Sequence, residues 1–415
     1  MSKTPKLRFK EFSGDWESKT VKQLMNEKII EQPLDGNHGE IHPTTNDYVE
    51  TGIPFIMASD LYNGKVDYLN CKYISEETAK GLRKGFAKEG DVLITHKATI
   101  GEIALVKNID TNYIVLTPQV TYYRVNDYSI LNNIYLKSYF ESANFMNTFK
   151  KIASDGSTRS YIGITKQQEL DIRYPKIEEQ EKIASFFSLI DDKISLQDEK
   201  VEALKDYKKG MMQKIFSREL RFKDDDGRDY PEWEEKKLDD LIKIKSNRNK
   251  NSVVELVLSV SNTKGFITQS EQFEDRIVAS SDISNYKIVE KDDFAFNPAR
   301  INVGSIARLK LYDKGIISPM YICFKCLNSL ESDYLEYFLM THSFDVQMKK
   351  KLEGSVRQTL SSEALGEIVI DLPCLNEQKK IGEYLSTIND KLVKEQEKLD
   401  YLNEYKKGLL QQMFV

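Results

Sequence analysis

The chain is short of cysteine and histidine, and it lacks any long apolar run. Its 415 residues include four cysteines and four histidines. So few cysteines argue against the disulfide framework that staples small secreted domains. No apolar run reaches 18 residues, so no transmembrane helix is predicted. Residues 1–16 lack the apolar core of a signal peptide, and the sequence therefore predicts a cytoplasmic protein.

Metal and redox motifs are also missing. His38 and His42 are four residues apart, but the proline that follows predicts a loop rather than a helix, so no metal site is expected there. Cys323 and Cys326 form a single CxxC inside a strand-like run. Without a second pair, structural cysteines are favoured over a zinc or redox site. The sequence therefore predicts no bound metal.

Two further patterns resemble catalytic motifs without matching them. Asn297-Pro298 lacks the second proline and the aromatic residue of adenine methyltransferases, so it reads as a turn after a strand. Asp371 followed by Glu377 and Lys379 loosely resembles a nuclease carboxylate–lysine pattern. Because this stretch opens a repeated helix, we interpret it as helix surface. No phosphate-binding GxxxxGK[ST] is present. The sequence thus predicts no catalytic apparatus.

The charge balance excludes a simple DNA-binding domain. The net charge is −5, and no segment carries a basic excess. A protein that binds DNA alone normally shows a basic face. Either nucleic acid is not the ligand, or partner proteins supply much of the phosphate binding.

An ungapped repeat is the most informative feature that is present. Residues 175–217 and 373–415 align at a constant offset of 198, with 18 identical positions. A chain of this length is also too long for one core. The sequence therefore predicts two copies of one unit.

Both repeated segments predict long helices. Apolar residues alternate at spacings of four and three over more than four heptads, which is typical of a helix-to-helix seam. Polar residues interrupt both stripes at equivalent places, Gln197 with Glu395 and Lys208 with Lys406. About 40 residues at 1.5 Å each give a rod of about 60 Å. The two stripes can bury each other, or each can pack on its own globular domain. The predicted seam residues are Ile183, Phe187, Ile190, Ile194, Val201, Leu204, Ile381, Leu385, Ile388, Leu392, Leu399 and Leu402.

The segments between the helices predict globular domains rich in short strands. We expect domains at 1–174 and 218–372, a central helical spacer at 175–217 and a C-terminal one at 373–415. The fold class is α+β: two mixed α/β domains separated by a pair of long antiparallel coiled-coil helices. An antiparallel pair would set the domains at opposite ends, related by a pseudo-two-fold axis.

Paired polar loops are the remaining candidates for function. Arg, Asn and Gln can contact base edges, and Lys, Ser and Thr can hold phosphates. Ordinary solvated loops are the alternative, but equivalent loops in both copies favour a shared binding surface. The candidate DNA-binding residues are His96, Lys97, Thr99, Ser157, Thr158, Arg159, Tyr161, Arg300, Asn302, Ser355, Arg357 and Gln358.

Three short motifs occur twice: E-Q-x-K-I at 179–183 and 377–381, Y-K-K-G at 207–210 and 405–408, and G-S-x-R at 156–159 and 354–357. On these motifs the chain resembles the specificity subunit of a type I restriction–modification system. It departs from the pattern in two places: Asp292-Asp293 replaces Gly90-Asp91, and Gly52–Ile56 has no clear partner in the second copy.

The resemblance implies a division of labour. Each globular domain would be a target recognition domain that reads one half of a split site in double-stranded DNA, and the helices would set the spacing. Two modification (methyltransferase) subunits would bind S-adenosylmethionine, flip an adenine and methylate it. Restriction (endonuclease/translocase) subunits would use ATP and Mg²⁺. This chain would bind no cofactor and no membrane, and would catalyse none of these steps.

Two other functions compete with this one. A coiled-coil scaffold or adaptor that binds only proteins would also explain the repeated helices. An enzyme whose chemistry leaves no visible motif is the third possibility.

Overall fold

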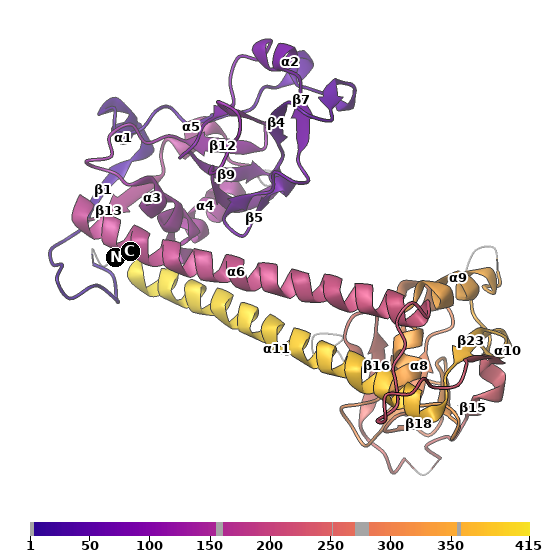
Figure 1. The fold of residues 1–415 in the computed structure, drawn as a ribbon. Helices are drawn as coiled ribbons and strands as arrows, with labels where there is room; N and C mark the ends of the chain where they lie inside the picture. The colour runs from indigo at the N-terminus through magenta and orange to yellow at the C-terminus, as the bar shows by residue number, and fades with distance from the viewer. Residues whose placement is uncertain (1–3, 155–160, 251, 270–281, 355–357) are drawn as a thin grey trace. The chain divides into compact units, whose positions relative to one another are not determined.

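The computed structural model describes residues 4–154, 161–250, 252–269, 282–354 and 358–415. The chain divides into two compact units, Met1–Glu199 with Gln396–Val415, and Lys200–Glu395. Two long helices, α6 (Ile177–Phe216) and α11 (Leu375–Met413), contribute residues to both units. Each unit therefore holds one globular domain, the start of the helix that follows it and the end of the other long helix (Figure 1).

The first domain is built on two sheets. A four-stranded sheet has the order β10-β9-β12-β2, and a five-stranded sheet has the order β3-β7-β4-β11-β8. Within these sheets only the pair β4·β11 is parallel among the described strands. Two ribbons, β5-β6 and β1-β13, complete the strands.

The strands of this domain are β1 (Glu17–Thr20), β2 (Leu34–Asp35), β3 (Tyr48–Val49), β4 (Ile53–Ile56), β5 (Leu61–Tyr62), β6 (Lys65–Val66), β7 (Lys72–Ile74), β8 (Phe86–Ala87), β9 (Val92–Lys97), β10 (Thr99–Leu105), β11 (Ile114–Leu116), β12 (Val120–Tyr123) and β13 (Asp171–Tyr174). Its helices are α1 (Val21–Asn26), α2 (Glu76–Lys80), α3 (Asn133–Glu141), α4 (Ala143–Ser154) and α5 (Ile164–Gln167).

Local sequence explains the elements that carry the candidate loops. Strand β9 lies between β10 and β12, so both of its edges are hydrogen-bonded. Val92 and Ile94 pack in one core and Leu93 in another, so both faces are covered, in keeping with the continuous apolar run at 92–94. Helix α3 begins where the Asn132 side chain accepts hydrogen bonds from two backbone N–H groups of the first turn. Helix α4 buries Phe145 and Phe149, which lie one turn apart on the same face.

The second domain repeats this topology. Its four-stranded sheets have the orders β15-β22-β19-β20 and β17-β16-β21-β18, and β14 pairs with β23. The strands are β14 (Glu234–Lys237), β15 (Ile242–Lys245), β16 (Val257–Ser261), β17 (Gly265–Thr268), β18 (Lys287–Glu290), β19 (Phe294–Phe296), β20 (Ile306–Arg308), β21 (Lys314–Ile317), β22 (Ile322–Cys326) and β23 (Val369–Leu372). The helices are α8 (Ser332–Phe338), α9 (His342–Lys350) and α10 (Ser362–Gly366), with a 3₁₀ turn, η5 (Ile301–Val303).

Strand pairing identifies the counterpart of β4, for which the sequence shows no clear partner. Phe55 of β4 pairs in parallel with Val115 of β11, and Val257 of β16 pairs in parallel with Ile316 of β21. Strand β16 therefore occupies the place of β4, although the two share little sequence. The α+β class and the internal repeat are confirmed, and the repeat extends through both globular domains.

The long helices pair antiparallel within each unit. In the first unit, Lys406 Nζ lies 2.8 Å from Asp191 Oδ1, and the last turns of α11 share a core with the first turns of α6. In the second unit, Lys208 Nζ donates to Asn389 Oδ1 at 2.7 Å, while Lys200 pairs with Glu395 at 2.5 Å. Residue numbers rise along one helix as they fall along the other, which defines the antiparallel direction.

The predicted seam residues are buried or half-buried throughout. Their partners differ along the helix, however. Ile183 and Phe187 belong to the same core as Leu170 and Ile172 of the first domain, so the start of the stripe packs on its own domain as well as on the other helix. Ile381 and Leu385 do the same in the second unit. Both packing modes considered from sequence are therefore present, in different turns of each helix.

Candidate nucleic-acid interface

The tip of the β9–β10 hairpin presents two of the predicted residues to solvent. Lys97 and Thr99 are paired across the hairpin, and both are exposed. Ala98 between them has φ +67°, a left-handed conformation that lets the chain reverse within so few residues. The turn therefore holds a cationic and a hydroxyl side chain side by side.

Tyr161 lies against this hairpin although it is far away in sequence. It forms an antiparallel bridge with Lys97, whose Nζ is 6.0 Å from the centre of the phenol ring. The N–H of the next residue, Ile162, donates to the carbonyl oxygen of His96 at 3.1 Å. Tyr161 is 46% exposed, so its ring is available at the surface. The structure thus brings Lys97, Thr99 and Tyr161 together.

His96 is not at this surface, and the prediction that it contacts DNA is wrong for this conformation. Its side chain is 0% exposed, and Nδ1 lies 2.5 Å from the hydroxyl oxygen of Thr121. Burial lowers the pKa of the imidazole to about 4. The Asp35 carboxylate, whose Oδ2 lies 3.9 Å from His96 Nε2, acts in the opposite direction but is outweighed. Residues 92–96 of β9 are all buried, so both faces of the strand are covered up to the hairpin tip, and exposure begins only at Lys97.

In the second domain the equivalent loop follows β19. Arg300 and Asn302 are both exposed, and Ile301 between them is only 3% exposed. The N–H of Arg300 donates to the carbonyl oxygen of Asn297 at 3.0 Å, and the N–H of Gly304 donates to that of Ile301 at 2.9 Å. Gly304 adopts φ +88°, which favours glycine. A buried anchor and a closed turn therefore hold the two polar side chains outward.

The second domain closes its two loops in the same way as the first. The N–H of Leu360 donates to the carbonyl oxygen of Pro298 at 3.1 Å. This bond is the counterpart of the one between Ile162 and His96. Gln358 is exposed two residues before Leu360. In both domains, therefore, the residues that follow the G-S-x-R segment are hydrogen-bonded at the end of an interior strand, β9 in the first domain and β19 in the second.

Five of the predicted DNA-binding residues lie outside the described residues. They are Ser157, Thr158, Arg159, Ser355 and Arg357.

The sequence-based interpretation of the stretch 377–379 as helix surface is wrong for Glu377 and for Gln378 beside it, whereas Lys379 is exposed. Glu377 and Gln378 are 0% and 1% exposed, and Glu179 and Gln180 are equally buried in the first unit. Gln378 Nε2 donates to the carbonyl oxygen of Ser329 at 3.1 Å, and its Oε1 accepts from the N–H of Glu331 at 2.8 Å. These bonds tie the first turn of α11 to the segment that leads into α8.

Each buried glutamate pairs with an arginine from the opening segment of its own unit. Arg8 donates to both carboxylate oxygens of Glu179 at 2.7 Å. Arg221 pairs with Glu377 at 3.0 and 3.3 Å, and Trp233 Nε1 donates to the same carboxylate at 2.9 Å. The repeated openings Leu7–Lys10 and Leu220–Lys223 carry the signal for this contact, because an isolated buried carboxylate needs a paired cation. These residues orient the helix relative to its domain and do not form a catalytic site.

The polar interruptions of the heptad stripes are satisfied differently in the two units. Lys406 contacts Glu141 at 2.7 Å as well as Asp191, and both carboxylates also bind Lys137. Burial alone would lower the pKa of Lys137, but Glu141 and Asp191 together raise it. In the second unit, burial lowers the pKa of Lys208. The first unit therefore has a four-residue ion network at the place where the second has a lysine–amide contact.

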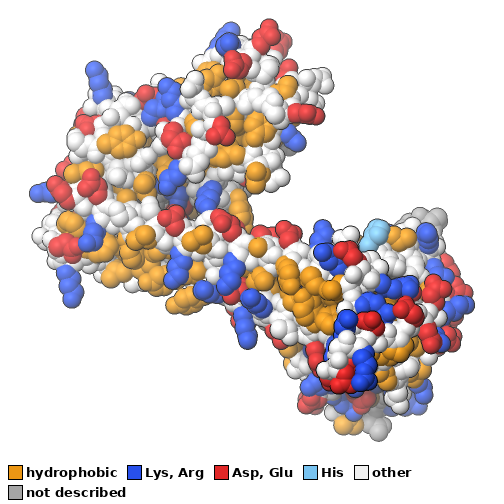
Figure 2. All heavy atoms as spheres, in the orientation of Figure 1, with side chains coloured by type: hydrophobic (Ala, Val, Ile, Leu, Met, Phe, Trp, Pro, Cys, Tyr) orange, Lys and Arg blue, Asp and Glu red, His pale blue; other side chains and the backbone are white. Residues whose placement is uncertain are grey.

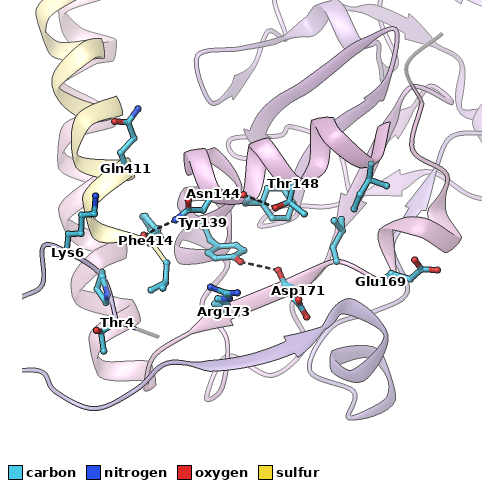
Figure 3. Close-up of a pocket in the computed structure, with 15 residues that line it drawn as sticks. Thr4, Lys6, Tyr139, Asn144, Thr148, Glu169, Asp171, Arg173, Gln411 and Phe414 are labelled. Atoms are coloured by element: carbon cyan, nitrogen blue, oxygen red, sulfur yellow. Dashed lines mark hydrogen bonds between the residues drawn. The ribbon is translucent and has the colours of Figure 1, made fainter. Parts of the chain in front are cut away.

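A cavity of about 420 Å³ lies where the end of α11 docks on the first domain (Figure 3). Asn144 Nδ2 donates to the carbonyl oxygen of Phe414 at 3.3 Å, and the Tyr139 hydroxyl donates to that of Asp171 at 3.1 Å. The ring of Phe414 packs edge-on against Trp16, with centroids 6.1 Å apart. The polar contacts in this wall hold a helix end and a strand in place.

The structure supports the interpretation of the cysteines as structural. Burial raises the pKa of Cys323 to about 12 and that of Cys326 to about 11. Protonated thiols are poor metal ligands and poor nucleophiles. Within the described ranges, no cluster of three or more His, Cys, Asp or Glu side chains could hold a metal ion. In that same part of the chain, no helix is long and apolar enough to cross a bilayer.

The chain thus contains two domains of one fold, and a repeated helix follows each of them. Each domain presents a pair of adjoining loops with its own exposed side chains, which is the arrangement of a protein with two separate recognition domains. Residues 14–206 and 230–403 both match the family described as type I restriction modification DNA specificity domain. The chain belongs to this family, and its two domains are DNA specificity domains.

The relatives agree over most of their lengths. The putative type I restriction enzyme MjaX specificity subunit of Methanocaldococcus jannaschii is 24% identical, covering 98% of this chain and 94% of that protein. The MjaVIII specificity subunit of the same organism is 25% identical over 88% of each chain. The crystal structure of the type I restriction–modification S subunit from M. genitalium superposes with a TM-score of 0.60 at 15% identity and covers 99% of each chain. This likeness establishes the shared fold.

Proposed function

We propose that this chain reads a two-part DNA site for a type I restriction–modification complex. Each domain recognises one half of the site, and partner subunits methylate an adenine or cleave the DNA. The chain supplies specificity and carries out no chemistry. Because its target is DNA, we place it in the cytoplasm.

One observation carries this proposal. Both domains fasten the same two loops together through one backbone hydrogen bond, Ile162 to His96 in the first and Leu360 to Pro298 in the second. The exposed side chains on these equivalent frames differ: Lys97, Thr99 and Tyr161 against Arg300, Asn302 and Gln358. Arginine reads guanine and asparagine or glutamine reads adenine through paired hydrogen bonds. A common frame with different side chains suits two domains that read different DNA words.

The charge of the chain supports a role for partners. Its net charge is −5, and Figure 2 shows basic and acidic side chains intermixed over the face that it draws. Counterion release on DNA binding requires many cationic contacts. We infer that two modification subunits close around the duplex and supply much of this charge. They would bind S-adenosylmethionine, and restriction subunits would use ATP and Mg²⁺.

The long helices suit a spacer. Helix α6 has 40 residues, which gives about 60 Å of helix. One turn of B-DNA is about 34–36 Å, so half-sites separated by unread base pairs lie within the reach of such a helix.

The test is methylation in the host and in purified components. Genome sequencing that detects methylated adenine should show a bipartite motif that disappears when this gene is deleted. Purified modification subunits should methylate that motif only when this chain is added. Equal methylation without the chain would refute the proposal. A complex that assembles but shows no cross-links from either globular domain to DNA bases would favour the scaffold function instead.

A further inference from the structure

A lysine doublet occupies the same place in both domains. Lys150 and Lys151 lie near the end of α4, with Lys151 in its last turn, and Lys349 and Lys350 lie in the last turn of α9. The two helices correspond because α4 buries Phe145 and Phe149 where α9 buries Phe344 and Met348, one residue before each doublet. All four lysines are exposed.

Each doublet lies beside the exposed loops. Helix α4 packs on β10, and a methyl group at Gly101 would come within 3.3 Å of Lys150 Cε. Gly101 lies two residues after Thr99 of the hairpin tip. Helix α9 packs on η5, which contains Asn302 and directly follows Arg300. Lys150 therefore lies close to the hairpin tip, and the helix that carries Lys349 and Lys350 packs on the turn that carries Asn302.

Most of these cations have no acidic partner in the part of the chain that the structure describes. Among the residues that the structure describes, Lys150, Lys151 and Lys350 form no ion pair, whereas Lys349 lies 2.8 Å from Asp345. Elsewhere in the two units, lysines beside acidic residues are commonly paired, as Lys245 is with Asp293 and Glu290. Lysine at a helix C-terminus also stabilises the helix through its dipole. That effect accounts for a lysine in the last turn, but it does not explain why the lysines lie near the exposed loops.

From this placement we propose that each doublet holds DNA backbone phosphates next to the base-reading loops of its own domain. The inference rests on the proposed function and adds a separate class of contact. Lysine is a flexible point charge that binds phosphate without selecting a base. The doublets would therefore position the duplex equally at any sequence, while the loop residues select the half-site.

The salt dependence of binding tests this. The assembled complex of the full chain with its modification subunits is titrated with a duplex carrying the methylated motif and with a random duplex, at several NaCl concentrations. Replacing Lys150 and Lys151 together by Gln should reduce the slope of log K against log salt by about 1.8, since each phosphate contact contributes about 0.9. Affinity at 0.15 M salt should fall about 10- to 30-fold for both duplexes alike. The Lys349→Gln, Lys350→Gln variant should behave in the same way.

Two controls separate the alternatives. Replacing both lysines by Arg keeps the charge and should preserve the slope. Lys80→Gln changes an exposed lysine in the last turn of α2, which packs on a different core cluster, and should leave the slope unchanged. An unchanged slope in the doublet variants, or a loss confined to the motif duplex, would overturn the inference. Failure of the unaltered complex to prefer the motif would instead refute the proposed function.

Discussion

The N–H of Ile162 lies 3.1 Å from the carbonyl oxygen of His96, and this one bond joins two loops separated by more than 60 residues of sequence. It places Tyr161 on the ring edge of a buried histidine and beside Lys97. In the second domain, the N–H of Leu360 donates to the carbonyl oxygen of Pro298, and this bond joins the segment that carries Gln358 to the loop that carries Arg300. Each domain therefore has a rigid frame on which the exposed residues can vary without changing the fold.

Arg300→Ala should weaken binding to one half-site only. A bidentate contact to a base is worth about 1–3 kcal/mol, so affinity for the methylated motif should fall about 5- to 150-fold. Competition binding with duplexes altered in either half measures the effect. Lys291→Ala, an exposed lysine just before β19, is the matched control and should have little effect. A loss spread evenly over both halves and random DNA would identify Arg300 as a phosphate contact.

Glu377→Ala should destabilise the second unit strongly. It removes the carboxylate that accepts from Arg221 and Trp233. The buried indole N–H of Trp233 loses its acceptor, while Arg221 keeps Glu232 and two backbone carbonyls, and an unsatisfied buried donor costs about 1–3 kcal/mol. Urea unfolding followed by Trp233 fluorescence, in a Trp16→Phe background, reports on this unit. Glu383→Ala, exposed on the same helix, should change stability by less than about 0.5 kcal/mol. Equal effects from the two substitutions would show that the buried pair does not hold α11 on its domain.

The stability of the first unit should depend on His96 in mild acid. The pKa of its imidazole is about 4 when folded and about 6.5 when unfolded. Between these values the unfolded chain takes up a proton that the folded chain does not. This contribution is therefore intact above pH 6.5 and lost as the pH falls towards 4, by about 3 kcal/mol in total.

The measurement uses Trp16 fluorescence in a Trp233→Phe background. Lowering the pH from 7.0 to 4.5 should cost the unaltered protein about 2–3 kcal/mol more than a His96→Gln variant. Parallel pH profiles for the two proteins would show that His96 is accessible to protons in the folded state.

The long helices should determine the spacing between half-sites. Inserting four residues after Gln197 of α6, together with four after the equivalent Glu395 of α11, adds about 6 Å to the paired helices. The methylated motif should then have a different number of unread base pairs between unchanged half-sites. Genome-wide methylation mapping reads both properties at once. The same insertion in the surface turn at Gly227 is the control. New half-site words with the old spacing would contradict the spacer role.

Local patterns explain what could be predicted. The 198-residue offset and the heptad spacing are properties of neighbouring residues on one helix, so they predicted the long helices and the twofold repetition. Lys97, Thr99, Arg300 and Asn302 were recognisable as exposed loop residues because turn residues follow an apolar strand. His96 was misassigned because the local sequence does not show how far along β9 both faces of the strand are covered, and burial extends to His96 itself.

Other features depended on contacts between distant segments. Glu377 and Gln378 look like helix surface in sequence, because nothing nearby shows that Arg221 and Ser329 will cover them. Strand β16 was recognised as the counterpart of β4 only through its parallel pairing with β21. The sequence likewise did not show which turns of each heptad stripe pack on their own domain and which pack on the other long helix. The composition of the two cores decided this.

The amino-acid sequence by itself determined that the protein is a duplicated unit with two long amphipathic helices, because helix periodicity is written in residues three and four apart. The tertiary structure alone decided which loops meet, which polar residues are buried and which exposed lysines lie near the loops. Those properties arise from hydrogen bonds and packing between residues tens to hundreds of positions apart, such as Ile162 with His96 and Arg221 with Glu377.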